Sequence, residues 1–177
     1  WNKEDPVHFK RFATLARLSL EDVLSREVTS VSKRPEKLFE SAAAISVISG
    51  DDIRRSGARS FQDALRMAPG VSVGAIDANT WAVTVRGFND MFSDKLLGLM
   101  DGRTIYSPLT SGVFWDVQDG LQEDIDRIEV IRGPGGTLWG ANAVNGVVNI
   151  VTKEARDTQG LYLSGGGGNV ERGFFGA

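Results

Sequence analysis

The chain has 177 residues, a formal net charge of −3 and no cysteine. This length fits one domain with a hydrophobic core of its own, and the charge lacks the basic excess typical of nucleic-acid-binding proteins. The absence of cysteine excludes disulfides and thiol catalysis. No apolar run approaches the roughly 18 residues of a membrane-spanning helix. The sequence does not begin with a signal peptide, and we therefore expect a mature chain or a piece of a longer protein.

The first 37 residues lack a clean periodicity, apart from two short patterns. Residues 19–24 predict a short helix with Ser19 as its N-cap. Residues 27–32 form a β-prone strip, followed by a charged linker at 33–37 that contains a proline. On its own, the strip is also consistent with an edge strand of the domain.

Two short helices are predicted after a strand at residues 44–48. The first spans residues 51–56, where Gly57 can act as the C-cap. The second begins with a capping-box-like pattern at Ser60, and Pro69-Gly70 ends it. The apolar face of this second helix consists of Phe61, Leu65 and Ala68.

Short strands follow in the middle of the chain. Val71 and Val73 alternate as a strand, and the pattern resumes at Val83 and Val85 after the polar loop at 77–80. Further expected features are a strand at 96–100, a tight turn at Asp101-Gly102 into 104–106, and a long loop at 107–120 with exposed Phe114 and Trp115.

Residues 126–152 are the stretch around which the rest is organised. The pattern is a β-rich strand, a glycine-rich elbow at 133–136, a short turn of helix, and a second β-rich strand at 147–151. Two strands so close in sequence should be neighbours in one sheet. The interleaving of strands and short helices predicts an α+β fold, with a small mixed β-sheet and packed helices.

Beyond Lys153 the composition becomes rich in glycine. Residues 160–164 alternate as a strand, and residues 169–177 begin a possible return strand. A lone hairpin with unpaired edges is marginal in water. We therefore predict that this segment is disordered in the isolated chain or pairs with another chain.

Catalytic and cofactor sites do not emerge from the sequence. The spacing of Gly135 and Gly140 matches a phosphate-binding loop, but Ala141-Asn142 replaces the required lysine and hydroxyl residue. The acidic residues Asp124, Asp126 and Glu129 lack a nucleophile or a second catalytic partner, and His8 stands alone. We predict no enzyme, no bound metal and no cofactor.

Four segments in order resemble the plug domain of TonB-dependent outer-membrane receptors, the Gram-negative importers of iron complexes and similar scarce nutrients. These segments are Ala68–Val71, Val85–Phe88, the Asp101-Gly102 turn and residues 126–152. The resemblance implies a lead at 1–26, a TonB-box-like strip and linker at 27–37, a plug at 38–155 and the stub of the first barrel hairpin at 156–177. It also implies three partners: a C-terminal β-barrel, TonB and a metal-complex ligand such as a ferric siderophore.

The resemblance also implies roles for particular residues. The TonB box corresponds to Glu27, Val28, Thr29, Ser30 and Val31. A lock against the inner barrel wall corresponds to Arg86 and Arg132, with Glu129 beside them, although from the residues alone the two arginines are consistent with ordinary surface positions. Residues in ligand-facing loops are Asp77, Asn79, Asn89, Met91, Phe92, Tyr106, Phe114 and Trp115. Several of the apolar ones would alternatively pack against the barrel wall.

The predicted function is therefore to gate a transporter in the outer membrane: the plug blocks the barrel pore, takes part in ligand binding and couples it to TonB. The expected substrate is an iron–siderophore complex, with haem, cobalamin or another metal complex as alternatives. A stand-alone periplasmic binding or interaction domain with a plug-like fold is the alternative function. The length of the parent reading frame distinguishes the two.

Overall fold

The computed structural model describes residues 27–28, 36–37, 43–77, 80–87, 90, 93–118, 120–168 and 173–176. Its contacts divide the chain into two units, residues 1–42 and 43–177. In the first unit, strand β1 (Glu27–Val28) pairs antiparallel with β2 (Glu36–Lys37). The second strand falls at the end of the segment that the sequence predicted as a charged linker. The predicted helix at 19–24 lies outside the described residues.

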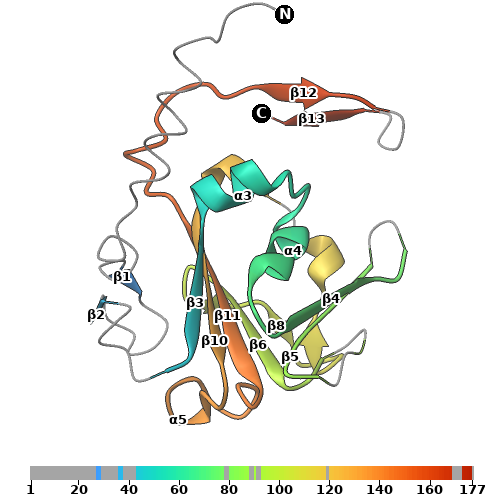
Figure 1. Ribbon diagram of the computed structural model, residues 1–177, viewed down its shortest axis with the longest axis vertical. Coiled ribbons are helices and arrows are strands. Elements are labelled where there is room, and N and C mark those ends of the chain that lie inside the picture. Colours follow the sequence, from blue (N-terminus) through green and yellow to red (C-terminus); the bar gives the residue numbers. More distant parts are fainter. Residues whose placement is uncertain are drawn as a thin grey trace, which may run out of the picture. The chain divides into compact units, whose positions relative to one another are not determined.

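The second unit is built on a five-stranded mixed sheet with the order β3-β10-β11-β6-β7 (Figure 1). Its strands are β3 (Ile45–Ser49), β10 (Ile125–Arg132), β11 (Gly146–Thr152), β6 (Leu96–Met100) and β7 (Arg103–Thr104). Both β3 and β11 run antiparallel to β10, whereas β6 runs parallel to β11. The mixed sheet predicted from the sequence is confirmed, and so is the pairing of the two strands that flank the elbow.

The hydrophobic core lies between one face of this sheet and the helices. The helical elements on this side are α3 (Gly50–Ser56), α4 (Phe61–Ala64) and the 3₁₀ turn η2 (Leu65–Met67) (Figure 1). Alternate residues of β10, Ile128 and Val130, point into the core and are fully buried there. Ile53 and Leu65 meet them from the helices. No helix among the described residues is long and apolar enough to cross a membrane.

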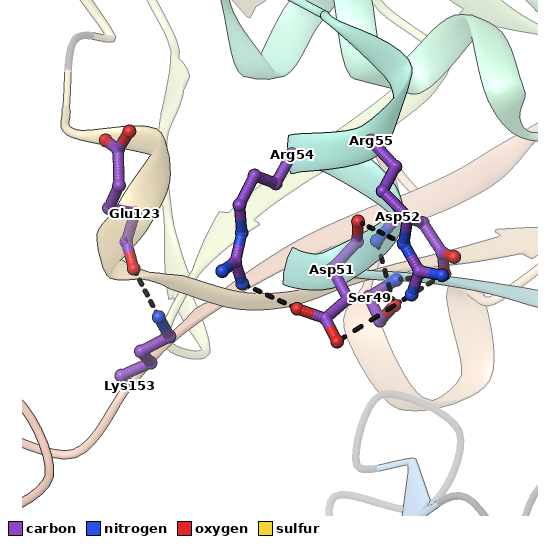
Figure 2. Close-up of polar contacts among 7 residues, drawn as sticks. All are labelled: Ser49, Asp51, Asp52, Arg54, Arg55, Glu123 and Lys153. Carbon is purple, nitrogen blue, oxygen red and sulfur yellow. Dashed lines mark hydrogen bonds and ion pairs between the residues drawn. The ribbon is translucent and has the colours of Figure 1, made fainter. Parts of the chain in front are cut away.

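Local sequence signals set the ends of α3. Ser49 and Asp52 form a reciprocal capping box: Asp52 N donates to Ser49 Oγ over 3.2 Å, and Ser49 N donates to Asp52 Oδ2 over 3.1 Å (Figure 2). Asp51 in the first turn also pairs with Arg54 at 2.5 Å. Gly57 ends the helix with a left-handed φ of 71°, as the sequence predicted.

Two small hairpins between β3 and β10 in the sequence stand outside the main sheet. Strands β4 (Val71–Ala75) and β5 (Trp81–Val85) form the first, and β8 (Tyr106–Ser107) and β9 (Gly112–Val113) form the second. Two 3₁₀ turns then lead into β10: η3 (Trp115–Val117) and η4 (Gln122–Asp124).

The sequence predicted an exposed loop at 107–120, and this prediction is wrong at Trp115. Only 3% of this residue is exposed, and its side chain belongs to the hydrophobic core. Gln62 of α4 donates its Nε2 to the carbonyl oxygen of Trp115 over 2.5 Å, which holds η3 against the helix. Phe114, one residue earlier, is half-buried. Contacts between distant segments thus decide the exposure of these aromatic residues.

The elbow between β10 and β11 contains α5 (Gly136–Trp139). After β11 the chain reaches a short antiparallel hairpin, β12 (Ser164–Gly166) with β13 (Phe174–Gly176). The strand predicted at 160–164 therefore begins only at Ser164. The preceding Leu161 is 84% exposed and lies outside any strand.

Candidate functional site

Two of the predicted lock residues, Arg86 and Arg132, lie near one end of the sheet and contact each other's glycine neighbours. The backbone N–H of Arg86 donates to the carbonyl oxygen of Gly70 over 3.1 Å. A Cβ added to Gly70 would lie 3.6 Å from Cδ of Arg132, and a Cβ added to Gly133 would lie 3.6 Å from Nη1 of Arg86. The side chain of Arg132 thus lies close to Gly70, whose carbonyl oxygen binds the backbone of Arg86. The guanidinium of Arg86 in turn lies close to Gly133, the residue after Arg132. The structure brings together two residues that are 46 positions apart in the sequence.

Their environment is unusual in two respects. Arg86 adopts a left-handed backbone with φ of 62°, a conformation that costs a non-glycine residue free energy and persists only where the surroundings impose it. Nε of Arg132 is buried and has no hydrogen-bond acceptor among the described residues. Within the same residues, neither arginine has an acidic side chain within ion-pair distance. This end of the sheet therefore presents positive charge and donors that an anion would satisfy.

Glu129, the third predicted lock residue, is fully buried on β10. Its Oε1 accepts from Nε of Arg127, two positions earlier on the same face of the strand, over 2.7 Å. Arg127 also pairs with Asp126 at 2.6 Å. Burial acts to lower the pKa of Arg127, but the hydrogen bonds and charges of the two carboxylates outweigh it, so the pKa is raised. Glu129 thus has a partner inside the domain.

A pocket of about 520 Å³ lies at the opposite end of the sheet, away from the two arginines. Ile53 and Arg54 of α3 line it, together with Ile125, Lys153 and Tyr162. Nζ of Lys153 donates to the carbonyl oxygen of Glu123 over 2.5 Å (Figure 2). The hydroxyl of Tyr162 donates to Oε1 of Glu123 over 2.7 Å. The lining mixes charges of both signs, and no predicted site residue belongs to it.

The predicted ligand-facing residues differ in what the structure shows of them. Asp77 is exposed and caps its own loop, since its Oδ1 accepts from the backbone N–H of Thr80 over 2.7 Å. Tyr106 and Phe114 are half-buried, and the buried Trp115 does not offer its ring at the surface. The remaining members lie outside the described residues: Asn79, Asn89, Met91 and Phe92.

The predicted TonB-binding strip is described at only two of its five positions. Glu27 lies opposite Lys37 and Val28 opposite Glu36 in the β1–β2 pair, and Val28 is buried. Thr29, Ser30 and Val31 lie outside the described residues. At Glu27 and Val28 the β character agrees with the sequence, and the role of the strip stays a prediction.

The family model for the TonB-dependent receptor plug domain matches residues 37–147 of this chain. The chain belongs to this family. The matched span contains all of β3 to α5, including Arg86, Glu129 and Arg132.

Similar proteins include a vitamin B12 transporter and an iron-regulated outer membrane protein. The plug is 34% identical over 144 residues to the vitamin B12 transporter BtuB of Vibrio vulnificus, which covers 80% of this chain and 23% of the relative. It is 40% identical over 118 residues to an iron-regulated outer membrane virulence protein of Vibrio cholerae, covering 63% of this chain and 17% of the relative. The chain thus spans about a fifth of the length of these relatives.

Solved structures share the fold. The siderophore receptor PirA of Acinetobacter baumannii is 30% identical, with a TM-score of 0.51 over 63% of this chain and 18% of that one. The α+β plug architecture predicted from the sequence is confirmed by the match to this family of structures.

Sequence reasoning missed one polar residue that shapes the site of this plug. Arg127 holds the buried Glu129, and the i, i+2 spacing of opposite charges on one strand face was the signal that would have found it. No group of three or more metal-ligating side chains occurs in the part of the plug that the structure describes.

Proposed function

We propose that this plug closes the pore of a TonB-dependent outer-membrane transporter that takes up an iron–siderophore or similar metal complex, and that it couples ligand binding to TonB. The observation that carries the proposal is the family match over residues 37–147, on a domain with the same α+β fold. Its partners are a β-barrel of the same protein, TonB and the metal complex. The location that follows is the outer membrane.

The choice of substrate draws on the relatives. The iron-regulated protein and the siderophore receptor support an iron complex, and the vitamin B12 transporter supports cobalamin. All three fit a class of scarce metal complexes. We place iron–siderophore complexes first, with cobalamin and haem as the alternatives.

The proposal assigns the paired arginines to the contact with the barrel. Arg86 and Arg132 would each bind an acidic side chain of the inner barrel wall. Support comes from the position of the two side chains next to Gly133 and Gly70 and from the strained backbone of Arg86. The buried Nε of Arg132, which has no acceptor among the described residues, supports it as well. Glu129 stays in the proposed lock as the acid of the same strand, with Arg127 as its partner inside the domain.

Two further surfaces complete the proposal. Residues 27–31 are the strip that TonB would pair with, through main-chain hydrogen bonds of an extended segment. The loops around Asp77, Asn89–Phe92 and Tyr106 would face the ligand. Trp115 is no longer among the residues expected to touch the ligand, because its ring belongs to the core.

Uptake by the full receptor tests this function. Cells that lack the endogenous gene would express it and be offered a labelled ferric siderophore, cobalamin and haem, with and without TonB. We expect surface binding and uptake of one metal complex, with uptake but not binding depending on TonB. Recovery of the protein in the periplasmic fraction without any uptake would instead favour a stand-alone binding domain.

A further inference from the structure

Arg86 lies in a turn at the end of β5 that contains two consecutive left-handed residues. Arg86 has a φ of 62° and Gly87 a φ of 93°. Glycine adopts such values freely, whereas arginine adopts them only where its surroundings impose them. The hydrogen bond from Arg86 N to the carbonyl oxygen of Gly70 holds the N–H side of the arginine. A second contact is needed on its carbonyl side, because one bond does not fix the dihedral angle.

The hydroxyl of Thr84 supplies this second contact. Thr84 is fully buried in β5, and its Oγ1 donates to the carbonyl oxygen of Gly87 over 2.8 Å. A hydroxyl has a single proton, so the same oxygen can only accept from its other neighbour, Oγ of the buried Ser93, at 3.4 Å. The Thr84 hydroxyl thus closes the turn around Arg86, and its own hydrogen bonds are satisfied.

The place of the Arg86 guanidinium depends on this turn. A Cβ added to Gly133 would lie 3.6 Å from Nη1 of Arg86, which puts the guanidinium next to the residue after Arg132. A change of φ at Arg86 would rotate its side chain about the backbone and move the guanidinium away from that place. The bonds of Gly70 and Gly87, one on each side of Arg86, resist this rotation together.

We propose that Thr84 is a positioning residue of the barrel lock, and that its hydroxyl holds Arg86 in the left-handed conformation that directs the guanidinium to the barrel. The inference rests on the proposed function, because the acid that Arg86 would bind belongs to the barrel. It gives a neutral, fully buried side chain a part in the lock without any contact with the barrel of its own.

The backbone of Arg86 in the 177-residue chain is the first measurement, because it does not depend on a barrel. The three-bond NMR coupling between the amide and α protons of Arg86 reports its φ. We expect Thr84→Val, which loses the hydroxyl, to shift this coupling, and Thr84→Ser, which keeps the hydroxyl, to preserve it. Thr84→Ala removes the same hydroxyl and replaces the valine variant if that variant does not fold. A coupling that does not respond to loss of the hydroxyl would overturn the inference.

Thr152→Val is the matched control for this measurement. It removes the hydroxyl that donates to Oδ2 of Asp101 over 3.0 Å, on another strand. The coupling of Arg86 should therefore stay unchanged. A shift as large as that of Thr84→Val would mean that any lost hydroxyl bond disturbs the turn, and it would count against a specific role of Thr84.

The full receptor measures the consequence for the lock. The readout is the urea concentration at which the plug leaves the pore, measured as conductance in a planar bilayer. Arg86→Ala should lower this concentration, and Thr84→Val should lower it by roughly 0.5–1 M while Arg86 is present. In the Arg86→Ala background, Thr84→Val should have little further effect, because it acts through the arginine.

The receptor variants distinguish failure of the lock from failure of the inference alone. If Arg86→Ala leaves the urea concentration unchanged, the proposed lock fails, and the role of Thr84 fails with it. If Arg86→Ala is effective but Thr84→Val causes an equal loss in both backgrounds, Thr84 serves the domain's own fold and only the inference is overturned. A loss confined to the receptor that retains Arg86, together with the shifted coupling, supports the inference.

Discussion

Glu129 and Arg127 form an ion pair whose two members differ in their access to water. The side chain of Glu129 is 0% exposed, whereas that of Arg127 is 20% exposed. Loss of the arginine would leave a fully buried carboxylate with one partner fewer. Loss of the carboxylate's charge would leave a guanidinium that can still reach water and Asp126. The cost of breaking the pair therefore depends on which side is removed.

We predict that Arg127→Met lowers the free energy of unfolding of the 177-residue chain by about 3 kcal/mol. Glu129→Gln should lower it by only about 1–2 kcal/mol, because the remaining arginine is partly solvated. Asp126→Asn, which removes the exposed partner, should cost less than about 0.5 kcal/mol. Urea melts of the three variants measure this order. Equal losses for Arg127→Met and Glu129→Gln would contradict it.

Tyr162 gives the domain a pH-dependent contact on its surface. The hydrogen bond that its hydroxyl donates to Glu123 favours the protonated phenol, and the pKa of Tyr162 is raised above the ordinary tyrosine value of about 10. A raised folded-state pKa means that the contact stabilises the fold below about pH 10 and is lost as the pH rises through the folded-state value.

An absorbance titration of the phenolate checks this assignment. We expect the signal that Tyr162→Phe abolishes to have a midpoint above about pH 10 in the folded chain. Glu123→Gln should move that midpoint downward, because the charged acceptor is gone. A midpoint that does not respond to Glu123→Gln would mean that another group raises the pKa.

The Asp101-Gly102 turn fastens β6 to the far end of β11. Asp101 has a left-handed φ of 50°, and its backbone N–H donates to the carbonyl oxygen of Ile150 over 2.8 Å. Its carboxylate accepts twice from Thr152: from the backbone N–H over 2.8 Å and from the hydroxyl over 3.0 Å. The turn thus anchors the last residue of β11 before the chain leaves the sheet.

Asp101→Ala should lower the free energy of unfolding by about 1–2 kcal/mol, through two lost hydrogen bonds and a left-handed backbone that alanine tolerates less well. Thr152→Val loses only the hydroxyl bond, so about 0.5 kcal/mol is expected. Asp101→Gly separates the two causes, because it loses the bonds but relaxes the backbone. Thermal melts would reject this account if Thr152→Val cost as much as Asp101→Ala.

The TonB-box-like strip at residues 27–31 yields a functional prediction of its own. If TonB pairs with residues 27–31, then Val28→Pro removes a backbone N–H and fixes φ, and it should abolish uptake by the full receptor while surface binding of the ligand persists. Thr29→Ala should have little effect, because the main chain would carry the pairing. Side-by-side assays of binding and uptake measure both properties.

Glu36→Pro is the matched control for this experiment. It disturbs the β1–β2 pair from the other strand and leaves residues 27–31 unchanged. If Glu36→Pro abolished uptake as fully as Val28→Pro, the pairing of β1 with β2 would matter instead of the strip itself. Uptake that survives Val28→Pro would place the TonB contact elsewhere.

Elements whose signals are local were predictable from the sequence. The residues that cap helix α3 are Ser49 and Asp52 at its start and Gly57 at its end, all within nine residues. The structure confirms the helix predicted there. Trp115 was not predictable in this way, because its burial depends on Gln62, 53 positions away. A sequence window around residue 115 contains nothing that indicates this contact.

Two arginines of the candidate site could be named from the sequence, but their arrangement in space could not, and their role stays a prediction. The resemblance to plug domains singled out Arg86 and Arg132, whereas their contact through Gly70 and Gly133 needed the three-dimensional structure. The buried Nε of Arg132, which has no acceptor among the described residues, is a property of packing, and no residue pattern encodes it. The positive φ of Arg86 is equally hidden, since arginine has no preference for that conformation.

The lock gives a prediction that spans the whole receptor. Arg86→Ala would leave a barrel carboxylate buried without its partner. If the pair is fully desolvated, this should lower the free energy that holds the plug in the barrel by about 3–5 kcal/mol. In the 177-residue chain the same substitution should cost far less, because Arg86 is exposed there. Denaturant melts of the two proteins compare these costs. Equal destabilisation would mean that Arg86 serves the domain's own fold.

The order of the strands also determines how the domain bears a mechanical load. The chain enters the sheet at Ile45, opposite Ile131, and leaves it at Thr152, opposite Ile125, at the other end (Figure 1). A tension applied between residues 43 and 153 therefore runs along the strands. Under such shear the five register pairs of β3 with β10 resist together, whereas a pull across the sheet would open them one after another. The sheet is thus stiff along the line that joins its two ends, and a hairpin such as β4–β5, which lies outside that line of force, carries none of the tension.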